Sequence, residues 1–88
     1  MDEEFDELKR EFLVEAHEKV RDIKRTWTSP APEDREAIEH MLHLAHQLKG
    51  AGGSYGFQTI STEAAALEEA LEEKLTGVDE AAPTIVLR

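Results

Sequence analysis

The sequence contains no cysteine, and this absence excludes two common ways of holding a small protein together. Without thiols the chain forms no disulfide framework and holds no structural zinc ion on cysteine ligands. A chain of 88 residues must therefore be stabilised by its own hydrophobic core. The lack of cysteine also suits a reducing compartment, and we expect the protein to be cytoplasmic.

Basic side chains are scarce, and long apolar runs are absent. Ten Lys and Arg residues stand against twenty Asp and Glu residues, which gives a net charge of −10. Such a chain repels the phosphates of nucleic acids and of anionic lipids, so neither is expected as a partner. No apolar stretch approaches the roughly 20 residues of a membrane span. The N-terminal segment Met1-Asp2-Glu3-Glu4 carries three acids, whereas a signal peptide begins with basic residues.

Apolar residues recur at steps of three and four along the first part of the chain, which is the period of one helix face. This pattern predicts an α-helix over about residues 3–27. The expected inward-facing residues are Phe5, Leu8, Phe12, Ala16, Val20, Ile23 and Trp27. Phe5 and Trp27 are expected to anchor the two ends of this helix in the core.

A second helix is predicted over residues 30–53. The prolines at 30 and 32 break the first helix but are tolerated in a first turn, with Ser29 as the N-cap. The helix is expected to end near Gly52 or Gly53, because glycine disfavours a helix interior. The expected core positions are Ile38, Met41, Ala45 and Leu48.

A third helix is predicted over residues 59–76, with Thr59 or Ser61 as its N-cap and Gly77 as its stop. The turn before it carries Tyr55 and Phe57, which are expected to pack against the end of the bundle. The expected core positions of the helix are Ile60, Ala64, Leu67, Leu71 and Leu75.

These elements predict an all-α antiparallel helical bundle in a single domain over residues 1–88, with a short or incomplete closing element at the C-terminal end. The tail, residues 77–88, contains a β-branched run after Pro83. It is interpreted as a closing element, as a linker, or as the start of a further domain.

His46 is the candidate functional residue, because it shares an exposed helix face with Lys49 and with Gly50, four residues after it. A neutral imidazole can attack phosphorus at neutral pH without a separate base. Lys49 would screen the arriving phosphoryl oxygens, and Gly50 would leave room for a partner. A carboxylate on the third helix would orient the ring; Glu68 is the first candidate and Glu72 the second.

The segment His46-Gln47-Leu48-Lys49-Gly50, followed by Ala51-Gly52-Gly53-Ser54-Tyr55-Gly56-Phe57, resembles the signature of histidine phosphotransfer (HPt) domains. The first helix is similar to the opening of the phosphotransfer domain of chemotaxis-type histidine kinases. The residues that carry this second likeness are Phe12, Glu15, Ala16, Glu18, Val20 and Ile23. In those domains a Glu on the following helix hydrogen-bonds the phosphoacceptor ring, and an ungapped alignment places Glu68 there.

The resemblance implies a phosphohistidine carrier in two-component signalling, not an enzyme with its own nucleotide site. His46 would accept a phosphoryl group and exchange it with an Asp of a response-regulator receiver domain, and a histidine kinase is the other implied partner. No cofactor is expected on this domain, and Mg²⁺ is expected on the partner. His43, Gln47 and Ser54 are the expected partner-docking side chains around His46.

One departure from the family concerns the end of the bundle. The family closes a four-helix bundle with further helices, whereas only a short tail follows the third predicted helix here. Three arrangements are compatible with this departure. The tail itself closes the bundle, or a second copy of the chain covers the groove as a homodimer, or the chain is a piece of a longer protein.

Two other interpretations fit parts of the sequence. A helical docking or dimerisation module would keep the fold without phosphoryl transfer, but it would not require His46 together with Lys49 and Gly50. The spacing of His40, His43 and His46 is compatible with a zinc or nickel site completed by Glu36 or Glu39. This pattern is weaker than the phosphotransfer signature, and no metal site is predicted.

Overall fold

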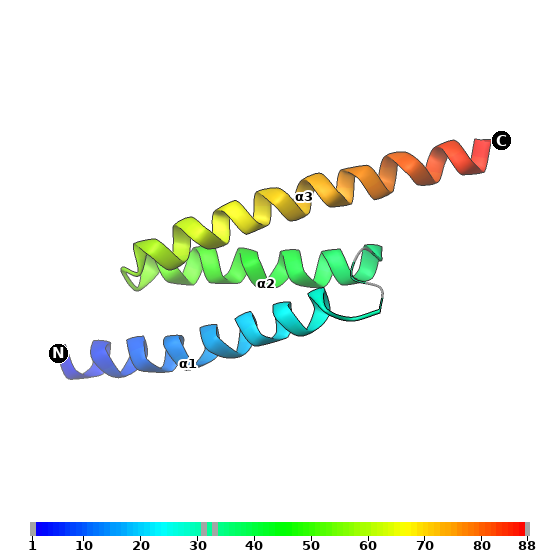
Figure 1. Cartoon of the computed structure of the whole chain (residues 1–88). Helices are drawn as coiled ribbons and strands as arrows, with labels where there is room; N and C mark the ends of the chain where they lie inside the picture. Colours follow the sequence, from blue (N-terminus) through cyan, green and yellow to red (C-terminus); the bar gives the residue numbers. More distant parts are fainter. Residues whose placement is uncertain (1, 31, 33, 88) are drawn as a thin grey trace.

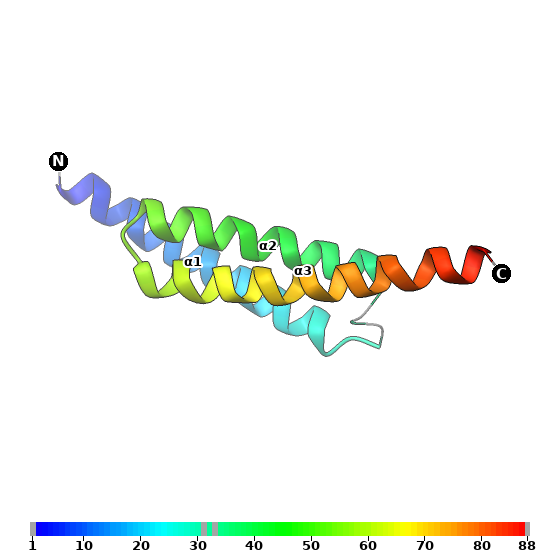
Figure 2. The ribbon, with the colours of Figure 1, turned by 90° about the horizontal axis from the view of Figure 1, so that it is seen from above.

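The computed structural model describes residues 2–30, 32 and 34–87, and for residues 2 and 79–87 it describes the backbone alone. Three helices follow one another: α1 (Asp2–Trp27), α2 (Arg35–Ser54) and α3 (Gln58–Leu87). Successive helices run in opposite directions, with α2 between α1 and α3 (Figure 1). Seen from above, α2 and α3 lie side by side, and α1 crosses them at an angle (Figure 2). The predicted all-α antiparallel bundle is confirmed.

The connection between α1 and α2 is longer than predicted. The Ser29 hydroxyl donates to the carbonyl of Thr26 at 2.6 Å, so it satisfies the end of α1 instead of capping α2. Asp34, with extended backbone at φ −63° and ψ 143°, is the N-cap of α2. The predicted start at residue 30 is therefore wrong, because the residues before proline favour extended backbone over helix.

α3 continues through Gly77 to Leu87, so the predicted end at residue 76 is wrong. A Cβ at Gly77 would meet no atom within 4 Å, so no neighbouring element forces the chain to turn there. One glycine costs a helix only about 1 kcal/mol. Residues 83–87 are helical, not a strand, and carry α3 past the end of α2 (Figure 1). Although α3 has 30 residues, neither it nor another helix among the described residues is apolar enough to cross a membrane.

A glycine turn joins α2 to α3. The Phe57 amide donates to the Gly52 carbonyl at 2.8 Å, and the Gly56 amide donates to the Gly53 carbonyl at 3.2 Å. Gly56 has φ +83°, which glycine adopts without strain. This is the Schellman arrangement, with Gly56 one residue past the C-cap Tyr55. Gly52 and Gly53 thus lie in the last turn of α2, which ends at Ser54, one residue beyond the predicted end. Neither Thr59 nor Ser61 is the N-cap of α3, which begins at Gln58.

Gly52 allows α2 and α3 to approach closely. A Cβ on Gly52 would lie 3.1 Å from the Ser61 backbone nitrogen and 3.2 Å from Cγ2 of Ile60. Backbone cannot move aside as the end of a flexible side chain can, so any larger residue at position 52 would push the helices apart. The buried Gly52 therefore sets the separation of α2 and α3 near the turn.

The core consists of two clusters along α2. The first joins all three helices through Phe12, Ala16, Leu48 and Ala64. The second lies between α2 and α3 and contains Ile38, Met41, Ala45 and Leu71. Ile23 packs against both clusters and is the α1 residue that reaches the second. The predicted core positions of α2 are therefore confirmed, and α2 supplies the centre of the bundle.

The prediction for α1 is only partly right, because α1 packs mainly against α2 and meets α3 through only part of its length. Phe12 and Ala16 are buried, but Phe5 is 45% exposed and Trp27 is 49% exposed, so neither anchors a core. An apolar groove of about 340 Å³ remains open between α1 and α3. Its lining residues are Val20, Ile23, Lys24, Leu48, Ile60, Glu63, Ala64 and Leu67.

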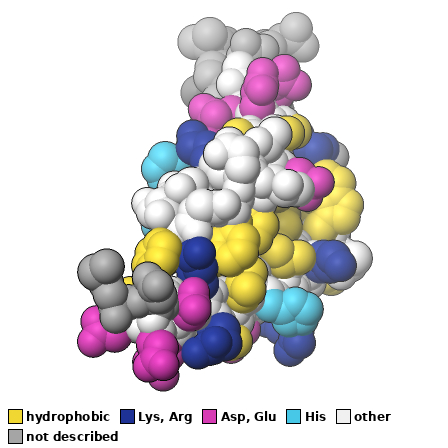
Figure 3. All heavy atoms as spheres, turned by 90° about the vertical axis from the view of Figure 1, so that its left-hand side faces the viewer, with side chains coloured by type: hydrophobic (Ala, Val, Ile, Leu, Met, Phe, Trp, Pro, Cys, Tyr) yellow, Lys and Arg dark blue, Asp and Glu magenta, His cyan; other side chains and the backbone are white. Residues whose placement is uncertain are grey.

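Aromatic side chains gather at the end of the bundle that carries the glycine turn. Phe12 stacks on Tyr55 and on Phe57, with ring centroids 5.3 and 5.5 Å apart. Phe5 extends this stack at 6.1 Å from Tyr55. Figure 3 shows hydrophobic side chains in the middle of this end face with charged side chains around them. The predicted packing of Tyr55 and Phe57 at the bundle end is confirmed.

Candidate functional site

His46 lies on the outer face of α2, and its side chain is 67% exposed. Its Nδ1 atom is 2.6 Å from Oε2 of Glu68 on α3. Because an ionised carboxylate can only accept a hydrogen bond, Nδ1 must carry the proton and donate it. Nε2 is then the ring nitrogen with the lone pair. The contact therefore selects one tautomer and one nucleophilic atom.

Lys49, one turn after His46 on α2, contacts the same carboxylate. Its Nζ atom is 2.6 Å from Oε1 of Glu68, so the two Glu68 oxygens have one partner each. The ammonium holds the carboxylate in place beneath the ring. That Lys49 also meets an incoming phosphoryl group stays a prediction; in this structure it acts on His46 through Glu68.

Glu68 is the least exposed member of this trio, with 14% of its side chain accessible against 39% for Lys49. The hydrogen bond from Lys49 lowers the pKa of the Glu68 carboxyl below its ordinary value, and the hydrogen bond from His46 adds to this effect. Glu68 is therefore charged at neutral pH. A charged, held carboxylate can stabilise positive charge on the imidazole without removing its proton. Glu72, the second candidate, is exposed, and the carboxylate that contacts the ring is Glu68.

Gly50 follows on the exposed side of α2, and a Cβ added there would meet no atom within 4 Å. Packing inside the domain therefore does not explain the glycine. A side chain at this position would project from the surface one turn beyond the imidazole. The structure thus leaves open space beside His46 on the side where a partner would approach.

The three predicted docking residues lie on α2, but at different places. Gln47 Nε2 is 3.2 Å from Nε2 of His43, and both side chains are exposed. Ser54 is exposed at the last position of α2, eight residues after His46.

A shallow hollow of about 400 Å³ beside the His46 ring brings apolar surface next to the ring. Its lining residues are Glu39, Leu42, His43, His46, Glu68 and Leu75.

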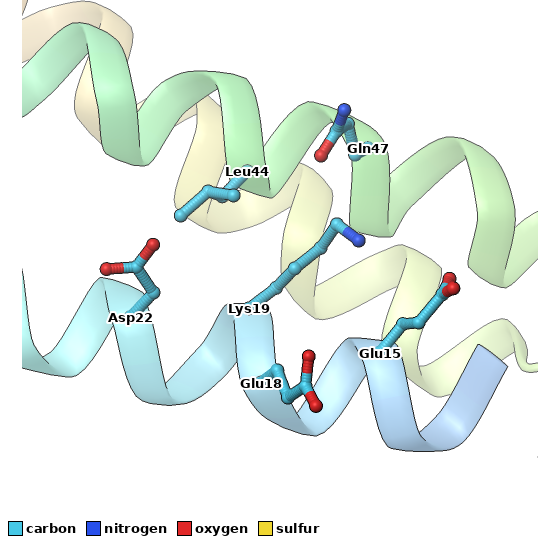
Figure 4. Close-up of a pocket in the computed structure, with 6 residues that line it drawn as sticks. All are labelled: Glu15, Glu18, Lys19, Asp22, Leu44 and Gln47. Carbon is cyan, nitrogen blue, oxygen red and sulfur yellow. The ribbon is translucent and has the colours of Figure 1, made fainter. Parts of the chain in front are cut away.

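Another hollow, of about 470 Å³, lies between α1 and α2 and does not include His46. Figure 4 shows Lys19 and Asp22 reaching from α1 toward α2, from which Leu44 points back. Charged side chains line most of it, and nothing in it combines a nucleophile with an orienting group. The reactive candidate is therefore the exposed ring and not this hollow.

The other histidines lack the arrangement around His46. His40 also contacts a carboxylate, but through Nε2, at 3.0 Å from Oδ2 of Asp22 on α1. His17 and His43 are exposed. Among the described residues, no group of three or more His, Asp or Glu side chains could hold a metal ion. In the described part of the chain, His46 alone has a carboxylate on Nδ1 that is itself held by a lysine.

One contact at this site was not foreseen from the sequence. The Ser61 hydroxyl donates to the backbone carbonyl of Lys49 at 3.0 Å, which links α3 to α2. The sequence pattern offered Ser61 as a helix cap instead. The signal that could have found the contact is the pair of glycines at 52 and 53, which implies close helix approach in that turn.

The sequence also matches a known protein family. The family model described as "Hpt domain" matches residues 7–86. The match spans most of the chain, so the chain belongs to the Hpt domain family. Members of this family are phosphohistidine carriers of two-component signalling, and they interact with histidine kinases and response-regulator receivers. No curated protein and no solved structure matches the chain.

Proposed function

We propose that His46 is the phosphoacceptor of this Hpt domain and that it exchanges the phosphoryl group with an Asp of a response-regulator receiver domain. The observation that carries the proposal is the contact of His46 Nδ1 with Glu68 Oε2 at 2.6 Å. This contact leaves Nε2 as the nucleophile on an accessible ring. Receiver and kinase supply the chemistry that the chain does not provide, so the domain is a carrier and not an enzyme.

In the transfer, the Nε2 lone pair forms a bond to phosphorus while the bond from phosphorus to the Asp carboxylate oxygen breaks. The bonding electrons leave with the Asp carboxylate. Nδ1 keeps its proton, so the ring acquires a positive charge as the N–P bond forms. Glu68 faces that charge directly and stabilises it more in the transition state than in the neutral ring. The reverse transfer uses the same contacts.

Lys49 prevents a competing outcome. A free carboxylate beside an imidazolium would be a better base and would tend to take the Nδ1 proton. The ammonium at 2.6 Å makes Glu68 a weaker base, in line with its lowered pKa. The proton therefore stays on Nδ1, and the phosphorylated ring remains a good donor for the return step.

The finer identity of the partners is proposed from the sequence resemblance of the first helix. The first helix resembles that of chemotaxis-type histidine kinases, and we propose that the domain works in a system of that type. His43, Gln47 and Ser54 would contact the receiver around His46. Mg²⁺ would be held by the receiver and would neutralise phosphoryl oxygens there.

The test uses a small donor and needs no cognate partner. The folded domain is incubated with phosphoramidate, and the modified residue is located by mass spectrometry. We expect an acid-labile phosphoryl group on His46 and not on His17, His40 or His43. His40 is the sharpest internal control, because it also has a carboxylate contact but through Nε2. Equal labelling of the four histidines, or none on His46, would reject the proposal.

Gly50 offers a prediction that separates the reaction at His46 from partner docking. In Gly50→Leu, labelling by phosphoramidate should stay within about twofold of the unmodified protein, whereas transfer from a phosphorylated receiver should fall about tenfold or more. The physical reason is that the new side chain would project into the open space beside His46. The two rates are compared by mass spectrometry.

The matched control is Gly77→Leu, because Gly77 is also an exposed helical glycine with open space around it. Both substitutions should raise the free energy of unfolding by about 0.5–1 kcal/mol, since glycine is a poor helix former. Only the change at position 50 should slow transfer from the receiver. Equal transfer rates in the two variants would show that Gly50 has no part in docking.

A further inference from the structure

The Ser61 hydroxyl donates its hydrogen bond to a residue of another helix, unlike the hydroxyls of Thr28 and Thr76. Thr28 and Thr76 each donate to the carbonyl four residues back, at 3.0 Å. This is the ordinary local bond of a hydroxyl at a helix position. The Ser61 hydroxyl, which is partly buried, donates instead across the interface to the carbonyl of Lys49 on α2, also at 3.0 Å.

This hydrogen bond and the ion pair between Lys49 and Glu68 hold the same α2 residue, Lys49, from two points on α3. Ser61 binds the backbone carbonyl of Lys49, and Glu68 binds its ammonium. Ser61 and Glu68 are seven residues apart, which is about two helical turns or roughly 10 Å along the axis. Two contacts at different heights resist both sliding and rotation of α3 against α2.

The backbone near Ser61 adds a steric stop to the polar contact. Gly52, one turn after Lys49, has Ser61 as its nearest neighbour on α3, and a Cβ there would be 3.1 Å from the Ser61 nitrogen. The helices therefore touch where the hydroxyl bond forms. Glu68, farther along α3, reaches His46 and Lys49 through a flexible side chain, so its position depends on how α3 is registered at Ser61.

We propose that Ser61 is a positioning residue, whose hydroxyl fixes the register of α3 along α2 and thereby holds Glu68 against Nδ1 of His46. Its relevance to phosphoryl transfer rests on the function proposed above. The proposed effect of Ser61 on the position of Glu68 concerns only the contact between His46 and Glu68. This contact is measurable in the unphosphorylated domain.

The test compares Ser61→Ala with Ser61→Thr, which restores a hydroxyl at the same place, and with the control Thr62→Ala, which removes an exposed hydroxyl from the next residue. The first readout is ¹⁵N NMR of the His46 ring, which distinguishes the Nδ1–H tautomer from the Nε2–H tautomer. The second is the rate of labelling of His46 by phosphoramidate. Both the NMR spectrum and the labelling rate are recorded only for variants that circular dichroism shows to be folded.

We expect Ser61→Ala to mix the two tautomers and to slow labelling about three- to tenfold, because small displacements of an orienting group are costly. Ser61→Thr should recover most of the rate, and Thr62→Ala should match the unmodified domain. A folded Ser61→Ala variant with an unchanged tautomer and rate would overturn the proposal while leaving His46 as the phosphoacceptor. If the wild-type domain is not labelled at His46, the proposed function fails. The tautomer of the His46 ring then decides by itself whether Ser61 positions Glu68.

Discussion

Glu68→Gln is expected to slow phosphorylation of His46 about 10- to 100-fold while leaving the fold intact. The substitution keeps the shape of the side chain but removes its charge. The amide can donate as well as accept, so it no longer requires the proton to be on Nδ1. It also offers no negative charge to the ring as the N–P bond forms. Orienting carboxylates in enclosed sites contribute larger factors, and the 67% exposure of His46 reduces the effect here.

The measurement is the rate of phosphoramidate labelling at His46, with Glu69→Gln as the matched control. Glu69 is the exposed neighbour of Glu68 on α3, and its substitution changes the net charge of the protein by the same amount. Labelling of Glu69→Gln should therefore remain at the rate of the unmodified domain. If the two variants are labelled equally fast, Glu68 does not support the nucleophile, and His46 acts as a merely exposed imidazole.

The sequence predicted the centre of this site well, because its parts obey local rules. His46, Lys49 and Gly50 lie within five residues of one helix, so helical periodicity alone places them on one surface. The contact with Glu68 was anticipated from a family resemblance, since periodicity only places that residue at the edge of the interface. The Ser61 hydroxyl bond depends on the exact register of two helices, which a single sequence does not specify.

The predictions of the fold are wrong where tertiary contacts override the local sequence pattern, or where an expected tertiary contact is missing. The apolar stripe of α1 predicted burial for Phe5 and Trp27, but the groove between α1 and α3 stays open, and both side chains remain about half exposed. Trp27 instead lies beneath the Lys74 ammonium, 5.2 Å from the ring centroid. Gly77 was interpreted as a stop, but a glycine ends a helix only where the chain must turn. At position 77 no packing partner imposes a turn.

Leu71→Ala is expected to lower the free energy of unfolding by about 2–5 kcal/mol. Leu71 is 1% exposed and packs with Ile38, Met41 and Ala45 of α2 in the second core cluster. α1 reaches this cluster through Ile23 alone among the described residues, so the open side of the bundle gives little to compensate for a cavity. A domain of this size has only about 4–13 kcal/mol of stability in total, so the loss is a large fraction.

Urea unfolding followed by circular dichroism measures the change, with Val14→Ala as the control. Val14 is 61% exposed on α1, and its truncation should alter the free energy of unfolding by less than about 0.5 kcal/mol. An equal loss in both variants would mean that the α2–α3 interface does not dominate stability. Leu71 lies one turn from Glu68 on α3, so the same interface that folds the domain also carries the carboxylate to His46. Where Leu71→Ala is folded, His46 should still be labelled, because its contacts with Glu68 and Lys49 do not include Leu71.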